Sequence, residues 1–232
     1  PREPLVPRRL GKNMCVPFGK ILRGKVVPNT VTKTLHTDKV YEPDLNSFTI
    51  EPFPYYSPLK SQIETIKSFD RPVILVDDLV HRADRLQVLV PQLREDGIPI
   101  RKVVVGVLSG YGRDLMQCLK VPVESIYSMP NLRQWFVEST LYPFIGGDTV
   151  RREEMKVAGL QPSINMILPY ATPRLSGCSR EALVEFSACC IENSKNLFQV
   201  LEAEYRKMYA KNLTLSRLSE AVLLPLCPDK GS

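Results

Sequence analysis

Hydrophobic residues recur along the middle of the chain in two alternating patterns. Short runs with almost no polar residues are typical of strands that are buried on both faces of a sheet. Between these runs, apolar residues recur every three or four positions, as they do in amphipathic helices. In chain order the pattern predicts helix, strand, helix, strand, helix and strand at 57–69, 72–77, 82–95, 102–108, 114–119 and 123–127. This alternation predicts an α/β fold with a doubly wound parallel sheet and helices on both faces.

Residues with known helix-end preferences mark several of these boundaries. Ser57 and Pro58 suit the N-cap and the first position of a helix. Gly97 suits the end of the helix that begins near Arg82. Ser179 precedes the longest predicted helix, roughly 180–210, so the C-terminal third is predicted to be α-helical.

Changes in composition divide the chain into three predicted parts. Residues 1–19 carry prolines and mixed charge and read as an extended lead-in. Residues 20–150 hold the alternating pattern and form the predicted α/β domain. Residues 151–232 are predicted to be a helical extension packed on that domain. Further helices are predicted at 131–140 and 214–223.

Charge and cysteine usage narrow the classes of partner. The 232 residues carry a net charge of +6, with a pI of about 9.0, which suits an anionic ligand such as a sugar phosphate. The basic residues between Arg2 and Lys25 form no dense run with interleaved aromatics, so nucleic acid is not a favoured partner. No apolar stretch has the length of a membrane-spanning helix, and the six cysteines show no metal-ligand spacing. We expect a cytoplasmic protein and, because the chain opens at Pro1, part of a longer one.

Two adjacent carboxylates, Asp77 and Asp78, end the first buried run. In open α/β sheets, ligands bind at the carboxyl ends of the strands. Paired carboxylates there can hold ribose hydroxyls or Mg²⁺, while the amides of the next helix accept a phosphate. Arg82 and Arg85 lie at the start of that helix, where the dipole disfavours cations unless an anion is bound, and His81 is a further donor. The simpler interpretation is that the carboxylates cap the helix and pair with the arginines.

The segment 71–85 resembles the ribose-phosphate signature of the type I phosphoribosyltransferases. That signature is an apolar strand, two acidic residues, two apolar residues and then Thr-Thr-Gly-x-Thr. Here the acidic and apolar pairs are matched by Asp77, Asp78, Leu79 and Val80. The phosphate turn departs from the signature, since its five positions hold His81, Arg82, Ala83, Asp84 and Arg85. The lost glycine matters where the turn needs a positive φ, and the arginines offer charge-assisted donors in place of hydroxyls.

The resemblance implies a phosphoribosyltransferase-type domain that binds a phosphorylated ribose, either phosphoribosyl diphosphate or a nucleotide. Mg²⁺ would reach Asp77 and Asp78 as part of the bound ligand complex. A base pocket is implied past the last strand, with Trp135, Phe144 and Asp148 as candidates, although core packing is the simpler role for Trp135.

Two further segments are candidates for a second phosphate. The turn from Ser109 to Arg113 contains glycines that let backbone amides face a ligand, although any strand-to-helix turn can use them. By order along the chain, the resemblance places a diphosphate loop near residue 30, although a turn and helix cap is the simpler account there. The candidates are Ser109, Gly110, Arg113, Asn29, Thr30 and Lys33.

Two functions stay open at this point. The first is a transferase that joins the phosphoribosyl group to a base and releases diphosphate, with no residue that looks like a dedicated nucleophile. The second is a catalytically degenerate relative that serves as a regulatory or interaction domain. Ala83 favours the second function, whereas Arg82 and Arg85 favour the first.

A weaker resemblance extends over nearly the whole chain. The segments 29–36, 56–59 and 142–149 are similar to the C-terminal part of clostridial proteins labelled putative cytidyltransferases. This resemblance implies a bacterial protein. Neighbouring domains of a longer chain, or a second copy in a homodimer, are the partners that we expect.

Overall fold

The computed structural model describes residues 12–18, 31–42, 47–53, 56–136, 138–143, 149–151, 167–169, 172, 173, 175 and 177–214. The chain divides into two compact units. The first unit consists of Pro1–Asp38 and Ile50–Leu132, and the second of Lys39–Thr49 and Arg133–Ser232. The predicted boundary at residue 150 therefore falls inside the second unit.

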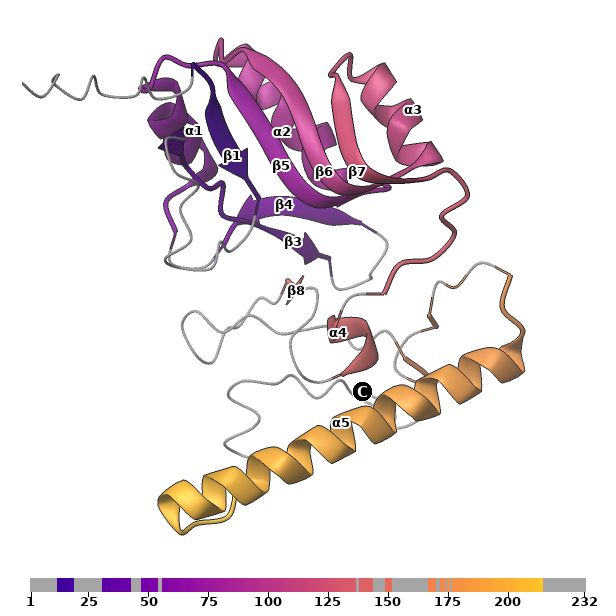
Figure 1. The fold of residues 1–232 in the computed structure, drawn as a ribbon. Coiled ribbons are helices and arrows are strands. Elements are labelled where there is room, and N and C mark those ends of the chain that lie inside the picture. Colours follow the sequence, from indigo (N-terminus) through magenta and orange to yellow (C-terminus); the bar gives the residue numbers. More distant parts are fainter. Residues whose placement is uncertain are drawn as a thin grey trace, which may run out of the picture. The chain divides into compact units, whose positions relative to one another are not determined.

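The first unit is built on a five-stranded parallel sheet in the order β2-β1-β5-β6-β7 (Figure 1). Its strands are β1 (Met14–Pro17), β2 (Val31–Thr32), β5 (Val73–Val80), β6 (Ile100–Ser109) and β7 (Val123–Met129). The apolar runs of the sequence form β5, β6 and β7, and their alternate residues are buried in the core. The predicted α/β class with a parallel sheet is confirmed, although β5 and β7 run two or three residues beyond their predicted ends.

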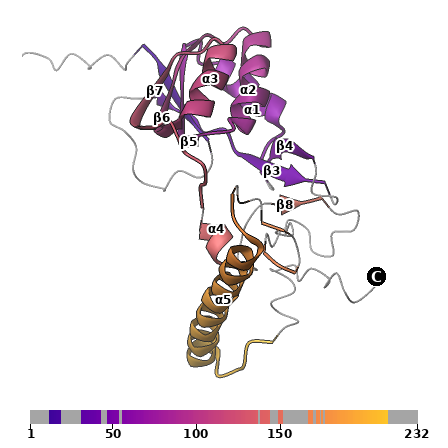
Figure 2. The same ribbon diagram turned by 90° about the vertical axis from the view of Figure 1, so that its right-hand side faces the viewer.

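Three helices of this unit cover one face of the sheet, as the two views of Figures 1 and 2 show. They are α1 (Leu59–Lys67), α2 (Asp84–Glu95) and α3 (Gly110–Cys118). Steps from β5 to β6 and from β6 to β7 run in the same direction, so right-handed crossovers place α2 and α3 on the same side. Helices on the second face stay a prediction, because the connection between β1 and β2 lies outside the described residues.

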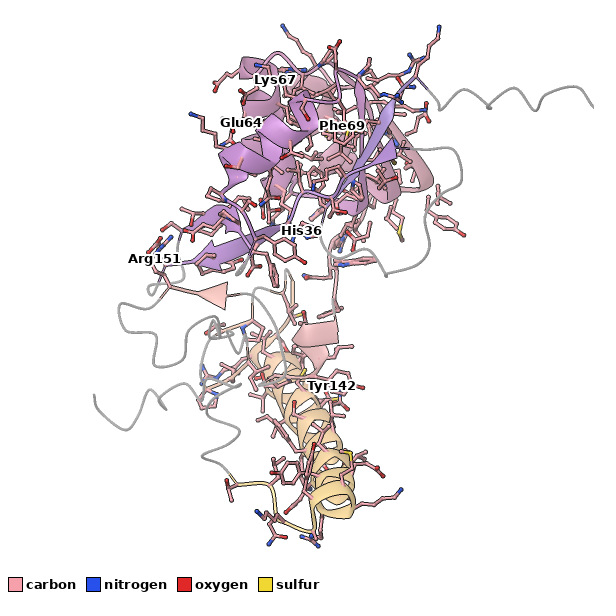
Figure 3. The ribbon with its side chains drawn as sticks, turned by 90° about the vertical axis from the view of Figure 1, so that its left-hand side faces the viewer. His36, Glu64, Lys67, Phe69, Tyr142 and Arg151 are labelled. Carbon is pink, nitrogen blue, oxygen red and sulfur yellow. The ribbon has the colours of Figure 1, made fainter. Side chains whose placement is uncertain are left out.

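The predicted periodicity accounts for how these helices pack. Buried residues of α1 and α2 recur at helical spacing and join the sheet in one hydrophobic cluster. The polar residues Glu64 and Lys67 lie on the exposed outer face of α1 (Figure 3). Gly97, with φ of 74°, follows α2 as predicted. The start of α1 comes one residue late, since Pro58 occupies the N-cap. The backbone carbonyl of Ser57 accepts a hydrogen bond from Gln62 Nε2 (2.7 Å).

Strand β1 corrects part of the prediction of an extended lead-in at 1–19, of which the structure describes only residues 12–18. It lies between β2 and β5, and its Met14 amide donates to the Pro72 carbonyl (2.8 Å). Met14 and Val16 are fully buried. The sequence gives little sign of this strand, because the run is short, contains Pro17 and follows a segment rich in proline and arginine.

The second unit contains a small sheet in the order β4-β3-β8, made of β3 (Thr37–Tyr41), β4 (Phe48–Pro52) and β8 (Thr149–Val150). The first residues of β3 and the last residues of β4 belong to the first unit by the division above. Arg151 ties this sheet together: its Nε pairs with Glu42 (3.0 Å), its Nη2 donates to Thr49 (3.1 Å) and its amide donates to the Tyr41 carbonyl (2.8 Å).

The longest helix of the described residues is α5 (Arg180–Tyr209), as predicted, and Ser179 Oγ caps it by accepting from the Ala182 amide (3.2 Å). Its buried face is centred on small residues. Ser187 accepts from the Leu168 amide (3.0 Å), and Ser194 donates to the Pro143 carbonyl (2.6 Å). Leu201 and Met208, although apolar, are exposed.

Two further helices are predicted in this part of the chain, at 131–140 and 214–223. Of the predicted helix 131–140, only α4 (Glu138–Leu141) forms. The predicted helix 214–223 lies outside the described residues apart from its first residue. None of the helices in the described ranges combines the length and apolar character needed to cross a bilayer.

Candidate functional site

The acid pair lies within β5, just past the carboxyl end of β1. The pairing of β1 with β5 ends at Pro17 and Val76, whereas β6 continues beside β5 as far as Val80. Asp77 and Asp78 therefore occupy the point where β5 extends beyond its neighbour. The strand order reverses at this same place, because the chain moves from β1 to β2 in one direction and from β5 to β6 in the other. Ligands of open α/β sheets bind in the crevice at such a switch point.

The two carboxyl groups differ in their surroundings. Asp77 is half-buried, and this burial is the main cause that raises its pKa to about 7. A hydrogen bond to Asp78 and the charge of Asp78 raise the pKa further, while the nearby charge of Arg85 lowers it. Asp78 is exposed. A cation or a hydroxyl donor bound between them would stabilise the ionised form of Asp77.

Backbone amides hold both carboxylates in place. The Asp78 amide donates to Asp77 Oδ1 (3.0 Å), and the Leu79 amide donates to Asp78 Oδ1 (2.8 Å). The predicted position at the end of the strand is corrected, since β5 continues for two residues after the pair. The alternative in which these carboxylates cap α2 is not what these contacts show, because each bonds within the strand.

The turn after β5 joins the acid pair to α2. His81 Nδ1 lies 2.8 Å from Ser109 Oγ, which links this turn to the end of β6. Arg82 is exposed, and Arg85 lies in the first turn of α2, near enough to Asp77 to lower its pKa. Ala83 occupies the N-cap with φ of 54° and ψ of 28°, and its methyl group provides no acceptor for the helix amides.

Ala83 therefore sits where the resembled signature has glycine and where the backbone is left-handed. We expect Ala83→Gly to change the free energy of unfolding by no more than about 1 kcal/mol, because relief of about 1–2 kcal/mol of backbone strain is offset by loss of a buried methyl worth about 0.8 kcal/mol. Ala83→Val should cost at least about 2 kcal/mol, since a β-branched residue is strained at positive φ and overfills the site. Urea unfolding of both variants tests this, and a valine variant as stable as the parent would contradict the left-handed turn.

The glycine amides of the turn at 109–113 are bonded inside the protein. Ser109 is buried and caps α3, its Oγ accepting from the Gly112 amide (2.9 Å). The Gly110 amide donates to the Pro130 carbonyl (3.2 Å). A Cβ on Gly110 would collide with that carbonyl oxygen, and one on Gly112 would collide with the carbonyl oxygen of Val80. The two glycine amides are thus bonded inside the protein, and close approach explains the glycines.

The other predicted site residues do not gather at the acid pair in the described part of the chain. Arg113 Nη2 donates to Ser128 Oγ (2.5 Å) on β7, and Lys33 is exposed. Trp135 is exposed and belongs to the second unit, contrary to core packing. Asn29, Thr30, Phe144 and Asp148 lie outside the described residues. The second phosphate site and the base pocket accordingly stay predictions.

Sequence reasoning missed the aromatic side chain next to this site. Tyr111 lies in edge contact with His81, with 5.9 Å between ring centroids and an interplanar angle of 62°. His81 and Ser109 are 28 positions apart in the chain, so no local sequence pattern indicates that they are in contact. The one available signal was an aromatic residue two positions after the carboxyl end of a buried strand.

Metal binding by the acid pair is chemically reasonable only together with a ligand. Within the described part of the chain, no three or more His, Cys, Asp or Glu side chains gather in a metal-binding group. Mg²⁺ is commonly held by one or two carboxylates together with substrate phosphates and waters. Asp77 and Asp78 fit that donor set, and binding of the ion would release the proton held by Asp77 near neutral pH.

Comparison with known proteins adds no further assignment. No protein-family model matches the chain, and no curated protein sequence matches it.

Proposed function

We propose that the first unit is a phosphoribosyltransferase-like domain that binds a phosphorylated ribose at the carboxyl edge of β5. Asp77 and Asp78 accept the ribose hydroxyls, directly or through Mg²⁺, and the turn from His81 to Arg85 receives the phosphate. The observation that carries the proposal is the position of the acid pair at the switch point, two residues before a turn with two arginines.

The two carboxylates, Asp77 and Asp78, have the chemistry needed to bind a sugar. Neighbouring hydroxyls of a ribose are two donors, and two carboxylates that lie within hydrogen-bond reach of each other offer the matching acceptors. Below pH 7 a proton occupies Asp77, so donors or a cation must replace that proton on binding. The affinity for the ligand should therefore be higher above pH 7 than below it.

The turn between β5 and α2 supplies positive charge, which is opposite to the charge of a phosphate. The helix α2 begins at Asp84, so its positive dipole end and the side chains of Arg82 and Arg85 lie in one short segment. A dianionic phosphate held there would offset the unfavourable placement of cations at a helix N-terminus. Charge-assisted hydrogen bonds from guanidinium groups are the strong kind.

We expect Arg82→Ala and Arg85→Ala each to weaken binding of phosphoribosyl diphosphate in the presence of Mg²⁺ by ~1.5–3 kcal/mol, which is about ten- to hundredfold in affinity. Isothermal titration measures this. Arg101→Ala is the matched control, because Arg101 is exposed at the amino end of β6 and should leave affinity unchanged. Unaltered affinity in both test variants would remove the turn from consideration.

One observation favours the degenerate alternative, in which the domain binds its ligand but does not turn it over. Ala83 occupies the left-handed N-cap, and the turn lacks the hydroxyl and glycine donors of the signature. Diphosphate release after adding purine or pyrimidine bases separates the two functions: sustained release identifies a transferase, whereas binding without release identifies a ligand-binding relative.

A further inference from the structure

Tyr111 presents an exposed aromatic ring at the carboxyl edge of the sheet. It is the second residue of α3, and 57% of its surface is exposed. Tyrosine combines a large apolar ring with a polar end, and it is enriched where a ring meets a partner. The ring contacts His81, which belongs to the turn proposed above to hold phosphate.

The backbone on both sides of Tyr111 is fixed. Gly110 is bonded to the Pro130 carbonyl, and Gly112 is bonded to Ser109 Oγ. His81 is held in turn by Ser109, so one buried hydroxyl positions both the helix start and the imidazole that contacts the tyrosine. The ring therefore has rigid support beneath it and solvent outside it, which is the arrangement that lowers the entropy cost of binding a flat ligand.

We propose that Tyr111, supported by His81, stacks on the base of a nucleotide whose ribose phosphate lies at the acid pair and the 81–85 turn. This inference rests on the proposed function and assigns its substrate class: a nucleoside phosphate is preferred to a free sugar phosphate. Stacking on an aromatic side chain tolerates any base, because every base has a π face. Purines, which offer more stacking area, should bind somewhat more tightly than pyrimidines.

The test compares AMP with ribose 5-phosphate by isothermal titration of the full chain. In the parent protein, AMP should bind roughly five- to hundredfold more tightly than ribose 5-phosphate. Tyr111→Ala should reduce AMP affinity to that of ribose 5-phosphate and leave the latter unchanged. Tyr111→Phe should keep the preference, whereas Tyr111→Leu, which retains apolar volume without a π face, should lose most of it.

A neighbouring tyrosine provides the control. Tyr127 on β7 is exposed as well, and Tyr127→Ala should leave both affinities unchanged. Equal affinity of the parent for AMP and ribose 5-phosphate would overturn the stacking role while keeping the proposed function. An equal loss of both ligands in Tyr111→Ala would overturn it too, since the residue would then act on the whole site. Absence of binding of both ligands to the parent would overturn the proposed function and this inference together.

Discussion

Asp77→Asn is expected to stabilise the folded protein, by about 2–4 kcal/mol at pH 8, while removing its affinity for Mg²⁺ and phosphorylated ribose. Burial raises the pKa of Asp77 from 3.8 to about 7. Each unit of such a shift is equivalent to about 1.4 kcal/mol, and partial exposure reduces the realised value. An asparagine keeps the shape of the side chain and an acceptor for the Asp78 amide, but carries no charge into the half-buried position.

The pH dependence follows from the direction of the shift. Between about pH 4 and pH 7 the folded state keeps a proton on Asp77 that the unfolded state has released. The free energy of unfolding of the parent therefore falls, through this group, as the pH rises across that window. The advantage of Asp77→Asn should grow from pH 5 to pH 8 and then level off.

Urea unfolding at pH 5, 7 and 8 measures this advantage. Glu64→Gln is the matched control, because Glu64 lies on the exposed outer face of α1 and should show no comparable gain (Figure 3). A destabilised Asp77→Asn variant, or an advantage that is flat with pH, would show that Asp77 is a structural residue. Gain of stability with loss of ligand is the behaviour of a carboxylate placed for binding at the expense of stability.

The central part of the fold was predictable because local pattern and tertiary packing agree there. The runs that form β5, β6 and β7 are apolar enough to be strands in any context, and the buried positions of α2 recur at helical spacing. The acid pair was found for the same reason, since it follows such a run. Even there the strand end was misplaced, because Val80 is buried against α3 and keeps β5 extended beyond the acids.

The parts that were missed depend on residues far apart in the chain. Strand β1 is a strand because β2 and β5 flank it on both sides, and four residues with a proline carry little signal of their own. The buried face of α5 is centred on Ser187 and Ser194, whose hydroxyls bond to Leu168 and Pro143. A periodicity that counts only large apolar residues gives no weight to these two positions.

The glycines of the 109–113 turn show the same limit for the candidate site. A Gly-x-Gly after a strand is compatible with amides that face a ligand and with a close backbone approach. Which of the two roles applies depends on the neighbours of the glycines, Val80 and Pro130. These lie about 20 to 30 positions away in the chain, so a local sequence pattern does not include them. In the structure both glycine amides are bonded inside the protein, as a packing role requires.

Gly112→Ala should accordingly cost at least about 3 kcal/mol in the free energy of unfolding, at the upper end of the range for overpacked interiors. The added Cβ would overlap the backbone carbonyl of Val80, and neither side can yield easily. Val80 is paired with Leu108 in the sheet, and Gly112 is bonded to the N-cap of its own helix. A flexible side chain could move aside, but two backbones cannot.

Gly97→Ala provides the comparison by urea unfolding. A Cβ there meets nothing within 4 Å, so its only cost is that of a left-handed alanine, about 1–2 kcal/mol. A Gly112→Ala variant no less stable than Gly97→Ala would contradict the close contact. If Gly112 instead served a ligand, its alanine variant would keep the parent's stability and lose only binding. Because Val80 directly precedes His81, the packing role predicts that stability and ribose-phosphate affinity fall together when α3 is forced away from β5.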